Sequence, residues 1–506
     1  MQAQEAVAGK TTVTLGLLRL LQKRALRVQP FKVGPDYLDT GWHTAICGVA
    51  SRNLDSFMLP PPVLNDLFCE QMRQADIAVI EGVMGLYDGY GVDPNYCSTA
   101  AMAKQLGCPV ILLVDGKAVS TSLAATVMGF QHFDPTLNLA GVIVNRVTSD
   151  AHYQLLKNAI EHYCSLPVLG YVPPCDGVAL PERHLGLITA RESLVNQQSW
   201  HDFAASLEQT VDVDALLSLS VLSALPTGMW PERPDNTAGA GLTLALADDE
   251  AFNFYYPDNI DLLERASVNI VRFSPLHDRA LPDCQMIWLG GGYPELYAAD
   301  LAANTAMLKH LRAAHQRGVA IYAECGGLMY LGSTLEDSGG EIHQMANIIP
   351  GHSKMGKRLT RFGYCEAQAM QPTLLAAPGE IVRGHEFHYS DFIPETPAVM
   401  ACRKVRDGRV LQEWTGGWQT GNTFASYSAR PFRPASGNVA ALAGGGEARI
   451  MTILAWCIAW VLDFYHRRPS TLAPSGTLDR SFNHVLCSVL CVAIVPAIKR
   501  CGLAAA

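Results

Sequence analysis

The segment Val319-Ala-Ile-Tyr-Ala-Glu-Cys-Gly-Gly-Leu-Met-Tyr-Leu331 decides the fold expected for the second half of this chain. An apolar run typical of a β-strand ends abruptly at Cys325-Gly-Gly, and a helix-like segment follows at once. A sharp strand-to-helix turn that exposes a reactive side chain is the layout of a nucleophile elbow. We therefore expect an α/β fold in which Cys325 is a catalytic nucleophile.

A second strand precedes the elbow. Gln285-Met-Ile-Trp-Leu runs into the glycine-rich turn Gly290-Gly-Gly-Tyr-Pro-Glu. Such a turn can offer backbone N–H groups to an oxyanion. A nucleophilic cysteine also needs a general base, and neither segment supplies one.

The bulk composition limits the class of protein. The 506 residues are enough for two or three domains. The formal net charge of −9 argues against a nucleic acid or an anionic membrane as the partner. The 14 cysteines lack metal-ligand spacing, and no signal peptide opens the chain. We therefore expect a cytoplasmic enzyme with reduced thiols.

Two apolar stretches near the C-terminus, Ile450–Leu462 and Val485–Ile498, are candidates for membrane insertion. Each is shorter than the roughly 20 residues that a membrane-spanning helix needs. Asp463 ends the first stretch, and Pro496 interrupts the second. We expect no transmembrane segment.

Residues 1–195 alternate short apolar runs with helix-like stretches. The expected strands are Val28–Val33, Ile77–Glu81, Val110–Asp115, Leu139–Asn145 and Val168–Val172. Continuous apolar strands between helices indicate a parallel sheet that is covered on both faces. The polar residues follow the carboxyl ends of the strands, where open α/β folds bind ligands.

Three further segments complete the expected organisation. Residues 196–240 contain a helix and then a linker rich in Pro, Gly and Asn. Residues 241–427 form a second α/β series. From Ser428 onward, residues 428–506 are rich in Ala, Gly, Arg and Pro and show no clear period, so we expect an irregular, poorly ordered tail.

The segment Gly9-Lys-Thr-Thr before a helix-like run has the form of the second half of a P-loop. In such a loop the lysine contacts the β- and γ-phosphates, the threonine hydroxyl contacts Mg²⁺, and the helix N-terminus faces the anion. The first half departs from the pattern, because Gln4-Glu-Ala-Val-Ala stands where glycines are needed. The strand that should precede the loop also has no room after Met1.

Acidic residues follow two of the expected strands. Asp36 and Asp39 come after the first strand, whereas Glu81 ends the second and Asp88 follows it. Carboxylates delivered to one edge of a sheet can form a site for Mg²⁺ and phosphate. Helix caps and turns are the alternative role for such residues.

Taken together, these motifs resemble the cobyrinic acid a,c-diamide synthase family, over residues 9–427. The matching segments include Lys32-Val-Gly-Pro-Asp-Tyr-Leu-Asp, Glu81-Gly-Val-Met-Gly-Leu-Tyr-Asp-Gly, Val144-Asn-Arg and Arg383-Gly-His-Glu-Phe-His-Tyr-Ser, besides the phosphate segment, the glycine turn and the elbow. The resemblance implies a P-loop synthetase domain like dethiobiotin synthetase, followed by a class I glutamine amidotransferase domain. It implies ATP, Mg²⁺, L-glutamine and a cobyrinic acid-type corrinoid as cofactors and substrates.

The resemblance also implies the roles of individual residues. In the synthetase domain it implies a nucleotide site formed by Gly9, Lys10, Thr11, Thr12, Asn145 and Arg146, a metal site at Thr11 and Glu81, and a corrinoid and γ-phosphate site at Asp36, Tyr37, Leu38, Asp39 and Asp88. In the amidotransferase domain it implies that Cys325 forms a thioester with glutamine, while backbone groups around Gly291 and Gly292 hold the oxyanion.

The chain departs from the family after Tyr427. Family members continue with a segment such as Leu-His-Val-His-Phe-Ala-Gln-Arg-Pro-Glu-Met, whose first histidine is the expected base for the cysteine. This chain has Ser428-Ala-Arg-Pro-Phe-Arg-Pro-Ala-Ser-Gly-Asn instead. One added nucleotide before suitable codons converts the family segment into this one, and a similar one-base change relates a glycine-rich P-loop to residues 4–9. We therefore expect both ends to be translated out of frame.

Two consequences follow for the activity. His385 and His388 do not replace the missing base by motif, so we expect glutaminase activity to be lost and nucleotide binding to be weakened. Two alternatives stay open, namely an inactive protein that only binds nucleotide or corrinoid, and the same chemistry on hydrogenobyrinic acid or a nickel-sirohydrochlorin. The sequence does not predict the oligomeric state.

Overall fold

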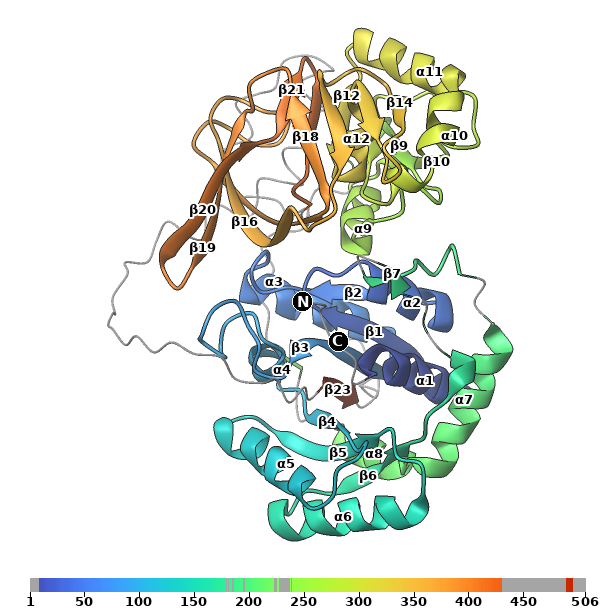
Figure 1. The fold of residues 1–506 in the computed structure, drawn as a ribbon, viewed down its shortest axis with the longest axis vertical. Helices are drawn as coiled ribbons and strands as arrows, with labels where there is room; N and C mark the ends of the chain where they lie inside the picture. Colours follow the sequence, from blue (N-terminus) through green and yellow to red (C-terminus); the bar gives the residue numbers. More distant parts are fainter. Residues whose placement is uncertain are drawn as a thin grey trace, which may run out of the picture. The chain divides into compact units, whose positions relative to one another are not determined.

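The computed structural model describes residues 9–429, with gaps at 179, 181, 184–185, 194–195, 223–224, 227–236 and 238, and residues 488–494. The chain divides into two compact units (Figure 1), one of residues 1–231 and 474–506 and one of residues 232–473. Most of the predicted linker and most of the predicted tail therefore lie outside the described residues. Among the described helices, none is long and apolar enough to cross a membrane.

The first unit is built on a seven-stranded sheet with the strand order β2-β1-β3-β23-β4-β5-β6. Its strands are β1 (Val28–Val33), β2 (Arg52–Leu54), β3 (Ile77–Gly85), β4 (Val110–Asp115), β5 (Leu139–Asn145), β6 (Val168–Val172) and β23 (Ser488–Ile494). Every pairing that does not involve β23 is parallel. The predicted strands are present, and the α/β fold class is confirmed. The short strand β2 was not predicted.

Helices surround this sheet and connect its strands. They are α1 (Lys10–Lys23), α2 (Leu38–Cys47), α3 (Pro61–Met72), α4 (Thr99–Leu106), α5 (Ser122–Phe133), α6 (Asp150–Cys164), α7 (Gln197–Thr210) and α8 (Val213–Leu219), with a 3₁₀ turn at Asp176–Val178 and a small ribbon of β7 (Glu182–Arg183) and β8 (Gly186–Leu187). Helix α7 packs on α1 so closely that a Cβ on Gly16 would lie 2.5 Å from Cε1 of Phe203. The helices after residue 196 therefore pack into the first unit.

Strand β23 comes from the far end of the chain, within the range expected to be irregular. It runs antiparallel to both of its neighbours, β3 and β4, which do not pair with each other in the described sheet. The facing edges of β3 and β4 carry main-chain N–H and C=O groups that must be paired when they are buried. The main chain of residues 488–494 supplies those partners. No periodic pattern in the sequence predicted this strand.

The second unit contains a six-stranded sheet with the order β10-β9-β11-β12-β22-β21. Its strands are β9 (Thr243–Ala247), β10 (Asn269–Phe273), β11 (Met286–Leu289), β12 (Ala320–Glu324), β21 (Trp418–Thr420) and β22 (Thr423–Ser426), and the helices are α9 (Pro257–Arg265), α10 (Ala298–Ala303), α11 (Thr305–Gln316) and α12 (Gly326–Leu331), with a 3₁₀ turn at Pro294–Leu296. All pairings are parallel except that of β21 with β22.

Two four-stranded sheets complete the second unit. One has the order β14-β13-β15-β18, and the other has the order β17-β16-β19-β20. Their strands are β13 (Thr334–Glu336), β14 (Ile342–Gln344), β15 (Gly351–Met355), β16 (Arg361–Ala369), β17 (Ile381–His388), β18 (Ser390–Pro394), β19 (Met400–Arg406) and β20 (Arg409–Gly416).

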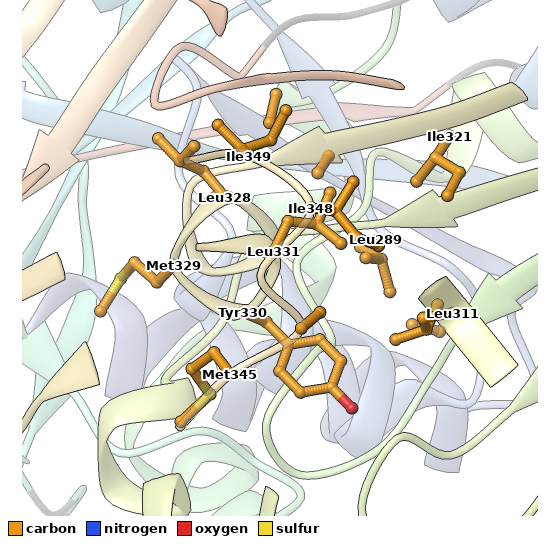
Figure 2. Packing of buried hydrophobic residues seen from close by; sticks show 14 of the residues in the cluster. Leu289, Leu311, Ile321, Leu328, Met329, Tyr330, Leu331, Met345, Ile348 and Ile349 are labelled. Carbon is orange, nitrogen blue, oxygen red and sulfur yellow. The ribbon is translucent and has the colours of Figure 1, made fainter. Parts of the chain in front are cut away.

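The short helix α12 is held by the hydrophobic core of the second unit. Figure 2 shows Leu328, Tyr330 and Leu331 of this helix among Leu289 of β11 and Ile321 of β12. All these side chains are buried. A helix of six residues has little stability of its own, so the packing of its apolar side chains fixes its position and that of the turn before it.

Candidate active sites

Helix α1 begins directly after Gly9. The φ angle of Gly9 is 73°, in the left-handed region that favours glycine. A Cβ on Gly9 would lie 2.6 Å from Nδ2 of Asn145, at the carboxyl end of β5. The helix N-terminus, with Thr12 half-buried in its first turn, therefore lies at the edge of the sheet where the parallel strands end.

Lys10 and Thr11 both reach β3. Lys10 Nζ donates to the carbonyl oxygen of Met84 over 2.6 Å. Met84 has a φ of 47°, a backbone conformation that costs energy for a residue with a side chain. Thr11 Oγ1 donates to Glu81 Oε1 over 2.8 Å. Burial, followed by the charge of Lys32, lowers the pKa of Lys10 to about 8.

Glu81 is the centre of a buried charge cluster. Lys32 Nζ lies 2.9 Å from Glu81 Oε1 and 2.6 Å from Asp39 Oδ2. His43 Nε2 lies 2.7 Å from Glu81 Oε2. Burial opposes ionisation of Glu81, but Lys32 and His43 outweigh it and hold its pKa below the usual carboxyl range. Burial likewise opposes the charge of Lys32, and Asp39 and Glu81 outweigh it and raise its pKa.

The segment before α2 carries the predicted corrinoid residues. Asp36 Oδ1 accepts from the backbone N–H of Asp39 over 2.8 Å, and Tyr37 and Leu38 are half-buried between them. Burial, followed by the charge of Asp39, raises the pKa of Asp36 to about 6. Asn53 Nδ2 donates to the carbonyl oxygen of Asp36 over 2.9 Å and so fixes this turn.

Two predicted residues lie at the border of the cluster. Asp88 is exposed and accepts from the backbone N–H of Gly85 over 2.8 Å. Its charge acts to raise the pKa of Lys10, against the larger lowering by burial and Lys32. Arg146 is paired with Asp115, because its Nε donates to Asp115 Oδ1 over 3.0 Å. The structure thus brings Gly9, Lys10, Thr11, Asp36, Asp39, Glu81 and Asn145 to one edge, with Arg146 paired elsewhere.

The donors at this edge fit a hard divalent cation. Thr11 offers a hydroxyl, and Asp39 and Glu81 offer carboxylate oxygens, which are the ligands that Mg²⁺ prefers. The lowered pKa keeps Glu81 ionised at neutral pH, as a metal ligand must be.

The sequence analysis did not assign Lys32 or His43. Lys32 was part of a quoted motif, and a lysine inside an otherwise apolar strand signals a buried charge that must be paired. His43 follows Asp39 by four residues, which puts both on one face of a helix. Neither signal identifies Glu81 as the shared partner, because that contact depends on the pairing of β1 with β3.

In the second unit, Cys325 lies between β12 and α12. Its φ of 47° is unusual for a non-glycine residue and typical of strained functional turns. Its backbone N–H donates to the carbonyl oxygen of Ser426 over 2.8 Å. A Cβ on Gly327 would lie 2.4 Å from the carbonyl oxygen of Leu289, so only glycine fits there.

The glycine turn after β11 lies beside the elbow. A Cβ on Gly291 would lie 3.6 Å from Cβ of Cys325, and a Cβ on Gly326 would lie 3.3 Å from the backbone nitrogen of Gly292. The N–H of Gly290 already donates to the Tyr255 hydroxyl over 2.8 Å. The main chain of Gly291 and Gly292 therefore adjoins the cysteine.

Ala429 stands at the position of the expected base. Its backbone pairs with that of His385 over 3.0 and 3.1 Å, and the family resemblance predicts a histidine at this position. Burial, followed by the charge of Glu295, raises the pKa of Cys325 to about 12. A thiol with so high a pKa needs a base to react at neutral pH.

The two nearby histidines are committed to other partners. His385 Nε2 lies 2.7 Å from the Tyr256 hydroxyl, and burial lowers the pKa of His385 to about 4. His388 stacks on Tyr427 with ring centroids 3.8 Å apart, and its Nδ1 donates to the carbonyl oxygen of Ser390 over 2.7 Å. The described contacts therefore give partners to His385 Nε2 and His388 Nδ1, whereas His388 Nε2 is buried without a hydrogen bond among the described residues, 3.5 Å from Glu386 Oε2.

Comparison with known proteins identifies the chain. The CobQ/CobB/MinD/ParA nucleotide binding domain family matches residues 2–188, and the CobB/CobQ-like glutamine amidotransferase domain family matches residues 243–435. The cobyrinate a,c-diamide synthase of Salmonella typhimurium is 99% identical over 419 residues, covering 83% of this chain and 91% of the relative. The protein of that name from Listeria monocytogenes serotype 4b is 51% identical over 428 residues, covering 84% and 94%. The chain therefore belongs to the cobyrinate a,c-diamide synthase family.

Proposed function

We propose that this protein is a ligase that uses ATP to amidate the a and c carboxylates of cobyrinic acid in cobalamin biosynthesis, in the cytoplasm. The first unit carries the synthetase reaction, and the second supplies ammonia from glutamine. The observation that carries the proposal is the ionised, buried Glu81 beside the Thr11 hydroxyl at the start of α1. The names of the relatives support the choice of substrate.

The synthetase reaction proceeds in two steps, phosphoryl transfer and then amide formation. A carboxylate oxygen of the corrinoid bonds to the γ-phosphorus of ATP, the bond to the bridging oxygen breaks, and ADP leaves. Ammonia then attacks the acyl carbon, loses a proton, and displaces phosphate to leave the amide. Lys10 holds the phosphates, and Thr11 and Glu81 hold Mg²⁺, which when bound neutralises developing charge. Asp36, Tyr37, Leu38, Asp39 and Asp88 border the corrinoid carboxylate.

Nucleotide binding involves further residues of the same edge. Gly9 and Thr12 bring the N-terminus of α1 to the phosphates. Asn145 lies against Gly9 and borders the nucleotide. Arg146, with its guanidinium held by Asp115, borders the adenine through its backbone and side-chain stem.

In the second unit, Cys325 attacks the amide carbon of glutamine. Ammonia is released, and a thioester forms between Cys325 and the glutamyl group. Water then hydrolyses the thioester to glutamate and frees Cys325. The main chain of Gly291, Gly292 and Gly326 holds the oxyanion. Because Ala429 provides no base, we expect this step to be lost in the present chain. Free ammonia bypasses Cys325 and still requires ATP, so we expect ammonia to support amidation better than glutamine does.

The test is a product assay by mass spectrometry. The chain is incubated with ATP, Mg²⁺ and cobyrinic acid, with either ammonium or glutamine as the nitrogen source. A diamide formed with ammonium supports the proposal. Binding of ATP and corrinoid without any product would instead indicate an inactive protein. Preference for hydrogenobyrinic acid or a nickel-sirohydrochlorin in parallel assays would change the substrate but not the chemistry.

We further propose that residues before Gly9 and after Tyr427 are translated out of frame. The 419 residues that match the Salmonella protein equal the length of the range 9–427. DNA sequence across codons 1–12 and 425–435 tests this proposal. An in-frame genomic read that encodes this same protein would contradict it.

A further inference from the structure

His43 of helix α2 is completely buried although its ring is polar. Its Nε2 lies 2.7 Å from Glu81 Oε2, and its Nδ1 lies 3.0 Å from the hydroxyl of Ser51. Ser51 is itself buried, and its backbone N–H donates to Thr44 Oγ1 over 3.1 Å. Two partners on different segments therefore fix the orientation of this ring.

These partners also decide which ring nitrogen carries the proton whenever the imidazole is neutral. The ionised carboxylate of Glu81 can only accept, so His43 Nε2 must donate to it. In the neutral ring, His43 Nδ1 then carries a lone pair, which accepts from the hydroxyl of Ser51. Ser51 thus selects the tautomer whose N–H is directed at Glu81.

The hydrogen bonds that described residues make to Glu81 leave one position for a further ligand. An ionised carboxylate offers about four lone-pair sites, two on each oxygen. Thr11 and Lys32 both use Oε1, and His43 uses one site of Oε2. The remaining lone pair belongs to Oε2, so the bond from His43 sets the direction in which it points.

His43 also connects the metal carboxylate to the substrate segment. Asp39 and His43 are four residues apart and lie on one face of α2. Lys32 links Asp39 to Glu81, with distances of 2.6 and 2.9 Å. Helix α2 is thus attached to Glu81 at two points, and its first turn carries Leu38 and Asp39 of the predicted corrinoid residues.

We propose that His43, held by Ser51, is a positioning residue that orients the free lone pair of Glu81 toward the metal ion. The role rests on the proposed function, in which Glu81 is a metal ligand. Partners that orient a metal ligand are worth about 10- to 100-fold in metal affinity or activity. The effect of losing the N–H at Nε2 is expected in that range.

The experiment compares two substitutions that keep different halves of the imidazole. His43→Gln places an amide N–H near the position of Nε2, whereas His43→Asn places one near the position of Nδ1. Mn²⁺ binding to the full chain is followed by electron paramagnetic resonance, and urea unfolding of each variant is measured in parallel. We expect His43→Asn to weaken Mn²⁺ binding about 10- to 100-fold, and His43→Gln to bind like the unaltered chain. Ser51→Ala is expected to fall between them.

The controls separate this role from the metal site itself. Glu81→Gln should abolish Mn²⁺ binding, and His152→Asn should not change it, because the His152 ring contacts only the carbonyl oxygen of Val119 among its described hydrogen bonds. If Glu81→Gln weakens binding but both His43 variants bind alike, the positioning role is wrong and the proposed function stands. If Glu81→Gln has no effect, or the unaltered chain does not bind Mn²⁺, the metal assignment itself is wrong and the positioning role falls with it.

A second measurement needs no variant. Proton–nitrogen NMR of the unaltered chain reports which ring nitrogen of His43 carries the proton. Protonation of Nε2 with a free lone pair on Nδ1 is the expected result. A neutral ring protonated on Nδ1 instead would overturn the assignment even if the variants failed to fold.

Discussion

The two candidate sites differ in what they are made of. The site of the first unit consists of charged side chains from α1, β1, α2 and β3, and Lys32 and Glu81 neutralise each other inside it. The site of the second unit consists mainly of backbone, where the strained Cys325 and the close approach of Gly327 to Leu289 define the geometry.

This difference determines how each site tolerates a lost residue. A turn that is fixed by core packing keeps its shape when a reacting side chain is replaced, as we propose for Ala429. A buried charge cluster cannot lose one member without leaving another charge unpaired. The second unit can therefore keep its fold when it loses its activity. In the first unit, a substitution that removes a charge of the site should also destabilise the fold.

The largest expected effect is the restoration of the missing base. Ala429→His should raise glutamine hydrolysis by about 10²- to 10⁴-fold, the usual contribution of a general base. Glutamate release at saturating glutamine measures it. Ser428→His, one residue earlier, is the matched control and should have little effect. Equal activity of the two variants, or none in either, would show that position 429 is not the base position.

Next is the charge cluster of the first unit. Lys32→Met should lower the free energy of unfolding by about 3–5 kcal/mol, because Asp39 and Glu81 are left as buried charges without their cation. Urea denaturation followed by tryptophan fluorescence measures the change. Lys157→Met removes a half-exposed partner of Glu161 at 3.7 Å and should cost less than about 1 kcal/mol. Similar losses in the free energy of unfolding for Lys32→Met and Lys157→Met would argue that Lys32 does not pair with buried charges.

The backbone of the elbow gives a smaller effect. Gly327→Ala places a methyl group against the carbonyl oxygen of Leu289, so we expect a loss of roughly 1–3 kcal/mol in the free energy of unfolding. Gly129→Ala in α5 is the control, because a Cβ there meets no atom within 4 Å. It should be neutral or stabilising by up to about 1 kcal/mol. An unchanged free energy of unfolding in Gly327→Ala would mean that the turn can relax to make room for the methyl group.

The smallest effect concerns pH and nucleotide binding. With a pKa of about 8, Lys10 is charged at lower pH and becomes neutral as the pH rises. The affinity for ATP should therefore fall by about fivefold from pH 8 to pH 9, and the fall should approach about tenfold, or about 1.4 kcal/mol, per pH unit above that. Calorimetric titration with ATP measures it. Lys10→Arg stays charged, so its affinity should be flat across this range, and a flat profile for the unaltered chain would contradict the role of Lys10.

Sequence patterns were most informative where one local rule was enough. The apolar runs at Val110–Asp115 and Leu139–Asn145 predicted β4 and β5 with their observed bounds, because strands buried on both faces must be continuously apolar. The abrupt end of an apolar run at Cys325 predicted the elbow, because few other turns join a strand directly to a helix at a reactive residue. The departure from the family segment after Tyr427 likewise predicts, from the sequence, that the base is missing.

Other features depended on contacts between distant segments. Strand β23 pairs with β3 and β4 through its main chain, and main-chain pairing leaves no distinctive pattern in the sequence. The roles of Lys32 and His43 arise because β1 pairs with β3 and places Lys32 opposite Glu81. The pairing of Arg146 with Asp115 likewise follows from the neighbouring ends of β4 and β5.

By itself, then, the sequence determined the α/β class, the segments that contain the candidate site residues, and the family. These features could be predicted because periodicity and turn preferences depend only on residues that are close together in the sequence. Only the tertiary structure decided which charges neutralise each other, which nitrogen of His43 faces Glu81, and what completes the central sheet. Those outcomes depend on strand order and register, which bring together residues that are far apart in the chain.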